Sequence, residues 1–148
     1  MIDTMPTAEV ANAERFERIG VSATPQTASR TRDEFATWLK QFFELDPGRS
    51  SDLVLAINEA LANSAEFAYV HTDGIGTMDI HASYDASEST ITVVVADRGE
   101  WRMSETPSET RARGRGIPLM RALSDRAAIE TSVDGTQVRL EWTNVPRR

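Results

Sequence analysis

The segment TMDIHASYDASESTITVVVAD, residues 77–97, contains two stretches with the pattern of β-strands. In residues 77–84 apolar side chains alternate with polar ones, which is the two-residue period of a half-buried strand. Residues 85–89 are polar and predict a turn, and residues 90–96 are rich in β-branched side chains. We therefore expect an antiparallel hairpin with His81 on its polar side.

The N-terminal residues divide into a tail and the start of a folded domain. Residues 1–13 are polar, lack periodicity and contain no apolar core of the kind found in secretory signals, so they predict a flexible tail. Phe16, Ile19 and Val21 then give a short, imperfect strand signal. We expect one folded domain over residues 14–148, because that length is typical of a single hydrophobic core.

Two amphipathic helices are expected between that strand and the hairpin. Thr24 can cap the first helix, in which apolar residues recur at three- and four-residue steps until Pro47-Gly48 stops the pattern. Ser50 or Ser51 can cap the second helix, which should end near Tyr69.

The C-terminal part of the chain predicts a long loop, a short helix and a second hairpin. Residues 98–113 are polar and aperiodic, and loops of that length are often lids or binding loops. A short helix is expected at residues 117–124, followed by strands at residues 127–133 and 136–142 that Asp134-Gly135 joins. This order predicts an α+β two-layer sandwich, with helices on one face of a mixed, mainly antiparallel sheet.

Composition excludes several kinds of protein. The 148 residues include 16 Lys plus Arg, 23 Asp plus Glu and no cysteine, and the formal net charge is −7. Disulfides, thiol chemistry and Cys-ligated zinc are therefore excluded, and the acidic balance argues against binding to nucleic acid phosphates. No segment approaches a membrane span, so we expect a soluble, cytoplasmic protein whose partner is a basic protein.

The second predicted helix contains a polar pair within NEALANSAEFAY, residues 58–69. Glu59 and Asn63 are four residues apart, so their side chains are neighbours on the helix surface. They lie off the apolar stripe that includes Ile57, and spacing alone favours a solvated polar face, because polar residues opposite a core face are normally solvated.

Asp97 ends an apolar strand, and Gly99 follows two residues later. A carboxylate there can accept a hydrogen bond from a buried base, and a glycine permits close approach of the backbone to a ligand. The same Asp-x-Gly pattern also occurs in ordinary turns.

A second glycine pair, Gly114 and Gly116, directly precedes the short predicted helix. Unpaired backbone N–H groups at a helix start favour anions, and the neighbouring Arg113 and Arg115 offer forked donors to phosphate oxygens. A flexible loop end with solvated arginines is the alternative. The Walker and dinucleotide-binding glycine signatures are absent from the sequence.

In this order, the motifs resemble the GHKL (Bergerat-fold) ATPase superfamily, which includes gyrase, Hsp90, histidine kinases and MutL. Within this superfamily the chain most resembles bacterial anti-sigma factors of the serine-protein-kinase type, which act in partner switching. The resemblance covers residues 16–142 and is most specific in residues 58–69 and in GRGIPLMRALSD, residues 114–125. It implies the histidine-kinase-like ATPase fold, with ATP and Mg²⁺ as cofactors.

The resemblance also assigns roles to individual residues. Glu59 matches the general base, Asn63 matches the ligand of Mg²⁺, and Asp97 matches the carboxylate that reads the adenine amino group. The remaining matched positions contact the nucleotide: Gly99 beside Asp97, Gly114 and Gly116 at the phosphates, with Arg113 and Arg115 as candidate phosphate donors, and Thr136 near the adenine.

The implied activity is that of an ATP-Mg-dependent serine/threonine protein kinase. It would phosphorylate a STAS-type anti-sigma-factor antagonist and sequester a sigma factor, and relatives of this type form homodimers. Two departures favour an alternative, a non-catalytic nucleotide-binding adapter. Phe67 stands where many relatives carry histidine, and the first glycine box, Asp97-Arg98-Gly99-Glu100-Trp101, lacks the second glycine of the superfamily pattern.

Overall fold

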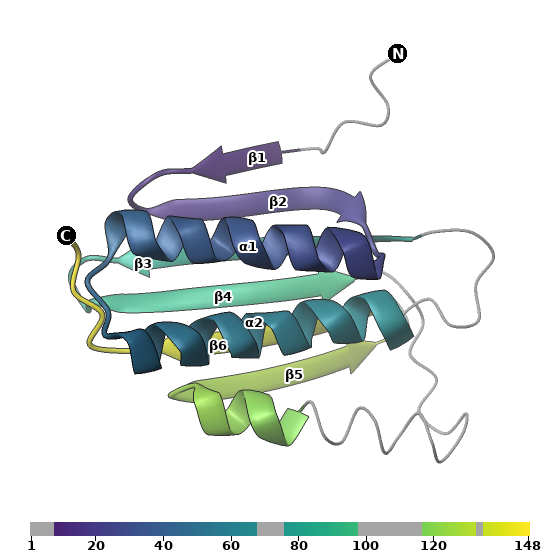
Figure 1. The fold of residues 1–148 in the computed structure, drawn as a ribbon. Helices are drawn as coiled ribbons and strands as arrows, with labels where there is room; N and C mark the ends of the chain where they lie inside the picture. Colours follow the sequence, from purple (N-terminus) through teal and green to yellow (C-terminus); the bar gives the residue numbers. More distant parts are fainter. Residues whose placement is uncertain (1–7, 68–75, 98–116, 133–134) are drawn as a thin grey trace.

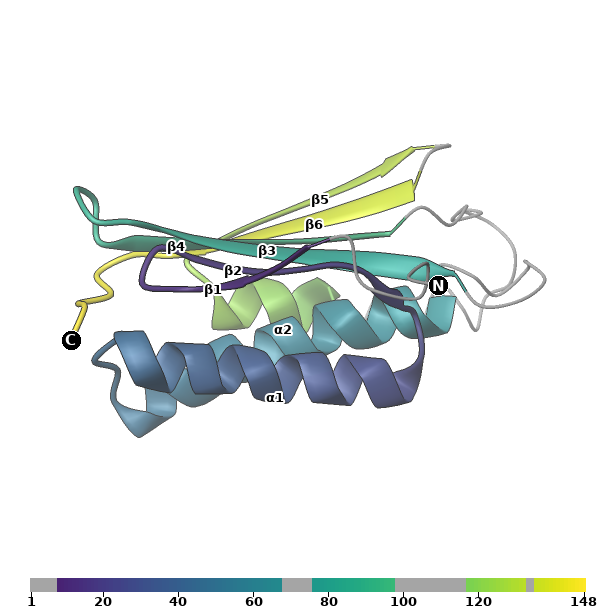
Figure 2. The same ribbon diagram turned by 90° about the horizontal axis from the view of Figure 1, so that it is seen from above.

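The computed structural model describes residues 8–67, 76–97, 117–132 and 135–148 of the chain, and these form two layers (Figures 1 and 2). One layer is a sheet of six strands in the order β1-β2-β3-β4-β6-β5. The helices all cover the same face of this sheet, as Figure 2 shows from above. The α+β two-layer class is confirmed. Every strand pairing among the described residues is antiparallel, so this sheet is antiparallel where a mixed, mainly antiparallel sheet was expected.

The predicted elements are present with small shifts at their ends. The strands and helices are β1 (Ala8–Ala11), β2 (Arg15–Ser22), α1 (Pro25–Phe42), α2 (Pro47–Phe67), β3 (Thr77–Asp85), β4 (Thr90–Asp97), a short helix over residues 117–123, β5 (Arg126–Ser132) and β6 (Gly135–Trp142). Among these described helices, none has the hydropathy of a membrane-spanning segment.

The expected flexible tail over residues 1–13 is wrong for its second half, because β1 forms there and pairs with β2. The turn between the two strands is held by Asn12, whose Oδ1 accepts hydrogen bonds from the backbone N of Glu14 and Arg15. Trp38 of α1 also donates its indole N–H to the backbone oxygen of Asn12 at 2.7 Å. Four residues give too short a pattern to predict a strand, and it is these tertiary contacts that stabilise it.

Both long helices begin at a proline. The predicted cap of α1 is confirmed, since the Thr24 side chain accepts a hydrogen bond from Thr27 N. The expected start of α2 at Ser50 or Ser51 is wrong. Asp46 is the capping residue instead: its Oδ1 accepts from Arg49 N at 2.8 Å, and Pro47 takes the first helical position, where its missing N–H costs nothing.

The apolar core lies between the helices and the sheet and includes a cluster of aromatic rings. Trp38 packs against Phe43 with ring centroids 4.9 Å apart, and Phe43 packs against Tyr84 at 4.8 Å. Full burial of each such large side chain contributes about 1.5–3 kcal/mol. This core fixes α1 and α2 against the sheet, so side chains on α2 have defined positions relative to the central strands.

The central hairpins follow the sequence pattern. β3 and β4 pair from Asp85↔Thr90 to Met78↔Asp97, and the turn between them is held by Ser87, whose hydroxyl hydrogen bond lowers the pKa of Asp85. The predicted hairpin of β5 and β6 is also present. β6 then pairs with β4, which places Thr136 directly opposite Asp97.

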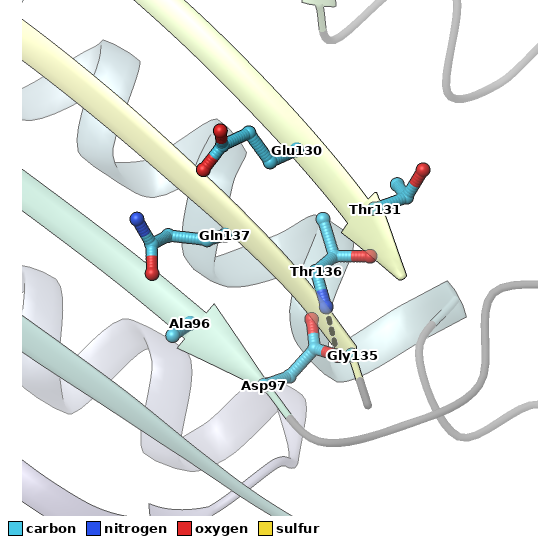
Figure 3. Close-up of a pocket in the computed structure, with 7 residues that line it drawn as sticks. All are labelled: Ala96, Asp97, Glu130, Thr131, Gly135, Thr136 and Gln137. Carbon is cyan, nitrogen blue, oxygen red and sulfur yellow. Dashed lines mark hydrogen bonds between the residues drawn. The ribbon is translucent and has the colours of Figure 1, made fainter. Parts of the chain in front are cut away.

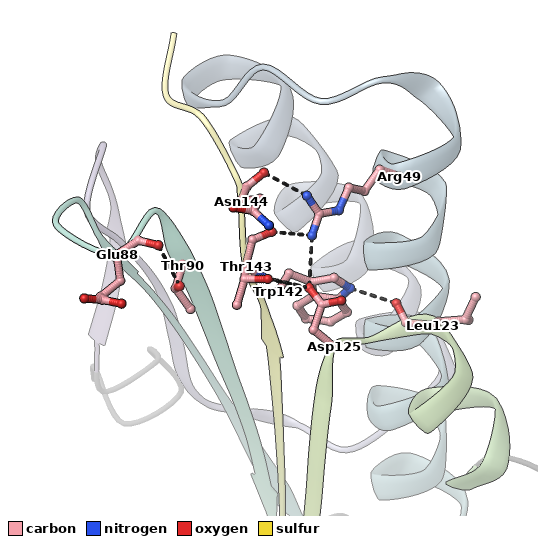
Figure 4. Close-up of polar contacts among 8 residues, drawn as sticks. All are labelled: Arg49, Glu88, Thr90, Leu123, Asp125, Trp142, Thr143 and Asn144. Atoms are coloured by element: carbon pink, nitrogen blue, oxygen red, sulfur yellow. Dashed lines mark hydrogen bonds and ion pairs between the residues drawn. The ribbon is translucent and has the colours of Figure 1, made fainter.

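The short helix over residues 117–123 is followed by a polar cluster that joins three parts of the fold (Figure 4). Arg49, near the start of α2, donates to Asp125 Oδ2 at 3.0 Å, to Asn144 O at 2.8 Å and to the backbone oxygen of Thr143. The Trp142 indole N–H donates to the backbone oxygen of Leu123, the last residue of the short helix. These contacts hold the short helix against the end of β6 that lies away from Thr136.

Candidate functional site

The candidate site lies where β4 ends and β6 begins. The register pairs Asp97 with Thr136, and the alternation of each strand turns both side chains toward the helix layer. Asp97 is 6% exposed and Thr136 is 3% exposed, although both are polar. Buried polar groups are normally satisfied by hydrogen bonds, so the contacts of these two residues indicate what the site can do.

The Asp97 carboxylate accepts hydrogen bonds from two different elements. The backbone N of Thr136 donates to Oδ1 at 3.4 Å (Figure 3), and the hydroxyl of Ser64, on α2, donates to Oδ2 at 3.2 Å. An ionised carboxylate is an acceptor only, with two oxygens. It is the type of group that suits a donor on a ligand, such as the amino group of adenine.

Asn63 and Glu59 lie one turn apart on α2, as their spacing predicts. Asn63 is 6% exposed, so the alternative of a solvated pair does not hold for it, whereas Glu59 is half-buried. Helical periodicity alone could not show this, because burial near the end of α2 depends on the rest of the fold.

Two buried polar atoms have no hydrogen-bond partner within the described part of the chain. They are Nδ2 of Asn63 and Oγ1 of Thr136, one on α2 and the other on β6. An unpaired buried donor or hydroxyl costs about 1–3 kcal/mol, which is a cost that a bound polar ligand removes. Both atoms belong to residues that the sequence predicts to bind the nucleotide or its metal.

A cavity of about 420 Å³, within the usual size range of small-molecule sites, opens where β4 and β5 end and β6 begins (Figure 3). No residue of α2 lines it, and strand alternation turns Ala96, Glu130 and Gln137 to the sheet face away from the helices. Two predicted site residues, Asp97 and Thr136, line it. The other lining residues come from the ends of β4, β5 and β6 and were not predicted: Ala96, Glu130, Thr131, Gly135 and Gln137. Their position follows from strand register, which the sequence does not display.

Ser64 is a second contributor that sequence reasoning missed. It shares the apolar face of α2 and is 3% exposed, but its hydroxyl contacts Asp97. The available signal was a hydroxyl side chain within an otherwise apolar stripe, directly after Asn63.

The remaining predicted site residues lie outside the described residues. Gly99, Arg113, Gly114, Arg115 and Gly116 all fall within residues 98–116, so their roles stay predictions. The helix expected directly after Gly116 is confirmed over residues 117–123.

The described residues fit an adenine nucleotide. The buried Asp97 carboxylate suits the adenine amino group. Among the described residues the Thr136 hydroxyl and Nδ2 of Asn63 have no partner, so both can bond to a ligand. An asparagine amide carries an oxygen of the type that Mg²⁺ prefers, and phosphates usually supply further ligands. The donor set therefore suits a nucleotide with its metal ion.

Comparison with known proteins agrees with this chemistry. The fold is similar to that in the crystal structure of the RsbU and RsbW domains of Rv1364c from Mycobacterium tuberculosis, with a TM-score of 0.66 and 23% sequence identity. The similarity covers 90% of this chain but 33% of that one, and at this identity it speaks for the fold alone. Residues 21–142, most of the chain, match the histidine kinase-like ATPase domain, which implies ATP binding. The chain belongs to the family of histidine kinase-like ATPase domains.

Proposed function

We propose that this protein is an ATP-Mg-dependent anti-sigma factor with serine/threonine protein kinase activity. The observation that carries the nucleotide part is the buried Asp97 carboxylate, held by donors from α2 and β6 beside a cavity. Membership of an ATPase family supports the same conclusion. The kinase part rests on the resemblance of the sequence to kinase-type anti-sigma factors.

Each residue of the proposed site has a distinct task. Asp97 accepts a hydrogen bond from the adenine amino group, and the Thr136 hydroxyl contacts the same base. Asn63 supplies an oxygen ligand to Mg²⁺, which when bound with ATP neutralises charge on the transferring phosphoryl group. Phosphoryl transfer needs mainly positioning and electrostatic stabilisation, so these binding residues perform much of the catalysis.

Glu59 is the proposed general base. It lies four residues before Asn63 on α2, about 6 Å along the helix axis, and it is half-buried. From there its carboxylate accepts the proton of the attacking serine or threonine hydroxyl as that oxygen bonds to the γ-phosphorus of ATP. The bond from the same phosphorus to the β–γ bridging oxygen breaks, and ADP leaves. Placing base and metal ligand on one rigid helix keeps their separation constant during the reaction.

The proposed partners are a STAS-type antagonist, which receives the phosphoryl group, and a sigma factor, which the protein sequesters in the cytoplasm as a homodimer. The net charge of −7 supports a partner with basic surface helices. Electrostatically guided association slows as ionic strength rises, so the association rate with the sigma factor should fall with added salt. An association rate that salt does not change would contradict this part of the proposal.

A non-catalytic adapter is the second candidate. It is favoured by Phe67, at a position where many relatives carry histidine, and by the first glycine box without its second glycine. An adapter would bind its partner fully even when Asn63→Ala removes the metal ligand. A kinase would require the intact site.

The deciding experiment measures transfer of labelled phosphate from ATP to STAS-type proteins of the source organism. Glu59→Gln should abolish transfer while the dissociation constant for ATP stays within about twofold, because the amide keeps the shape but accepts no proton. Glu66→Gln is the matched control, since Glu66 is exposed on the same helix. Transfer by Glu59→Gln at the wild-type rate would exclude Glu59 as the base, and a wild type without transfer would favour the adapter.

A further inference from the structure

A groove separates α1 from α2 on the outer side of the helix layer. Figure 2 shows the two helices side by side beneath the sheet, with their outer sides uncovered by any described element. The groove has a volume of about 390 Å³. One residue of α1 lines it together with five from the first half of α2: Arg32, Ser50, Ser51, Val54, Leu55 and Asn58. We call it the interhelical groove.

Leu55 gives the interhelical groove an apolar wall that faces solvent. It is 42% exposed, and within the described ranges no other large apolar side chain is exposed. Val54 beside it is half-buried and packs against the core. A single exposed leucine on a flat surface is ordinary, but Leu55 lines a groove, where a side chain of a partner can bury it. Interfaces between proteins concentrate their binding energy in pockets of this kind.

Two acidic side chains flank Leu55 on the same helix. Asp52 precedes it by three residues and Glu59 follows it by four, so all three side chains are neighbours on the surface of α2. Asp52 is exposed and Glu59 is half-buried. Neither carboxylate has an ion-pair partner among the described residues. Unpaired negative charge beside an exposed leucine favours a partner that brings positive charge next to an apolar side chain.

The basic residues of the helix layer do not cancel this negative charge. Arg32 pairs with Asp33 of its own helix at 2.9 Å. Arg30 precedes Arg32 by two residues and lies about 160° away around the helix axis. Lys40 follows Arg32 by eight residues, about 12 Å along α1. Arg49 donates to the polar cluster at the end of β6.

We propose that the interhelical groove binds an amphipathic helix of a partner protein. An aliphatic side chain of that helix packs on Leu55, and its neighbouring lysine or arginine side chains face Asp52. A second copy of this chain fits less well, because it brings the same acidic groove and a net charge of −7. The inference deepens the proposed function and rests on it for the identity of the partner, the sigma factor with basic surface helices.

The experiment measures binding of each purified sigma factor of the source organism by biolayer interferometry, for the wild type, Leu55→Ser and Asp52→Lys. Leu55→Ser should weaken binding about tenfold or more, mainly through faster dissociation. Asp52→Lys should slow association about fivefold at low ionic strength, and the difference should shrink as salt is added. Because Leu55 is exposed and lies outside the nucleotide site, Leu55→Ser should melt like the wild type and bind ATP with an unchanged dissociation constant.

Three further variants serve as controls. Leu55→Met keeps an aliphatic side chain and should bind the sigma factor within about threefold of the wild type. Gln41→Ser changes an exposed residue of α1 outside the groove and should have no effect. Glu88→Lys makes the same change of charge as Asp52→Lys at an exposed position in the turn between β3 and β4, and should change the association rate less than about twofold.

Two results would overturn the proposal while the proposed function stands. One is a sigma factor that binds Leu55→Ser, or associates with Asp52→Lys, as it does with the wild type. The other is a Leu55→Ser variant that forms a smaller assembly than the wild type in size-exclusion chromatography with light scattering, because a second copy would then occupy the groove. A folded, ATP-binding wild type that binds none of the sigma factors would instead contradict the proposed sequestration, and this inference with it.

Discussion

Replacing Asp97 by asparagine removes the negative charge of this residue and keeps the size and shape of its side chain. Thr136 N–H is a fixed backbone donor, so the amide oxygen should take the place of Oδ1 and the NH₂ group should face Ser64. The Ser64 hydroxyl can rotate and accept from that NH₂ group. The variant should therefore fold, with a free energy of unfolding within about 2 kcal/mol of the wild type, since both of these hydrogen bonds become neutral but each keeps a donor and an acceptor.

Binding of ATP should change far more than stability. A hydrogen bond to a charged group contributes about 1.5–3 kcal/mol, so its loss in Asp97→Asn should weaken ATP binding roughly 10- to 150-fold. Binding of GTP should weaken less, because the amide can donate to the 6-oxo group of guanine. Calorimetry with both nucleotides gives the two dissociation constants, and thermal melting checks the fold. A folded Asp97→Asn that binds ATP as tightly as the wild type would refute the role of Asp97.

Other substitutions test the unpaired hydroxyl and the polar cluster at the far end of β6. Thr136→Val removes a buried hydroxyl with no partner among the described residues. The free energy of unfolding of the free protein should therefore rise by about 1 kcal/mol, while ATP binding weakens. Loss of stability with unchanged ATP binding would contradict this prediction. Arg49→Ala removes the donors to Asp125 and to two backbone oxygens. The free energy of unfolding should fall by about 1–3 kcal/mol, and Tm should fall by about 2–4 °C for each kcal/mol lost. The exposed Arg30→Ala on α1 is the matched control, and equal melting of the two variants would show that the cluster contributes nothing.

The sequence predicts the central hairpin well because strand period, turn residues and β-branched content all agree over residues 77–97. It fails for β1, whose four residues carry little signal and depend on pairing with β2 and on the contact of Trp38 with Asn12. It also misplaces the start of α2. A serine cap was expected, but Asp46 caps one turn earlier and proline then begins the helix.

The candidate site likewise contains residues that the sequence predicts and contacts that it does not predict. Glu59, Asn63, Asp97 and Thr136 were predicted because their types and order resemble a known family. The contact between Ser64 and Asp97 was not predicted, because helical periodicity shows which residues share a face but not which strand that face meets. The residues of β5 that line the cavity depend on strand register in the same way.

The most direct test of the nucleotide site is calorimetric binding of ATP and ADP, with and without Mg²⁺, to the wild type and to Asn63→Ala. Asn63 is buried, and its amide nitrogen has no partner among the described residues, so alanine removes an unsatisfied donor and the variant should fold. We expect Mg²⁺-dependent binding of ATP by the wild type that Asn63→Ala loses. A folded wild type that binds neither nucleotide, or an Asn63→Ala that binds Mg-ATP unchanged, would contradict the proposed site.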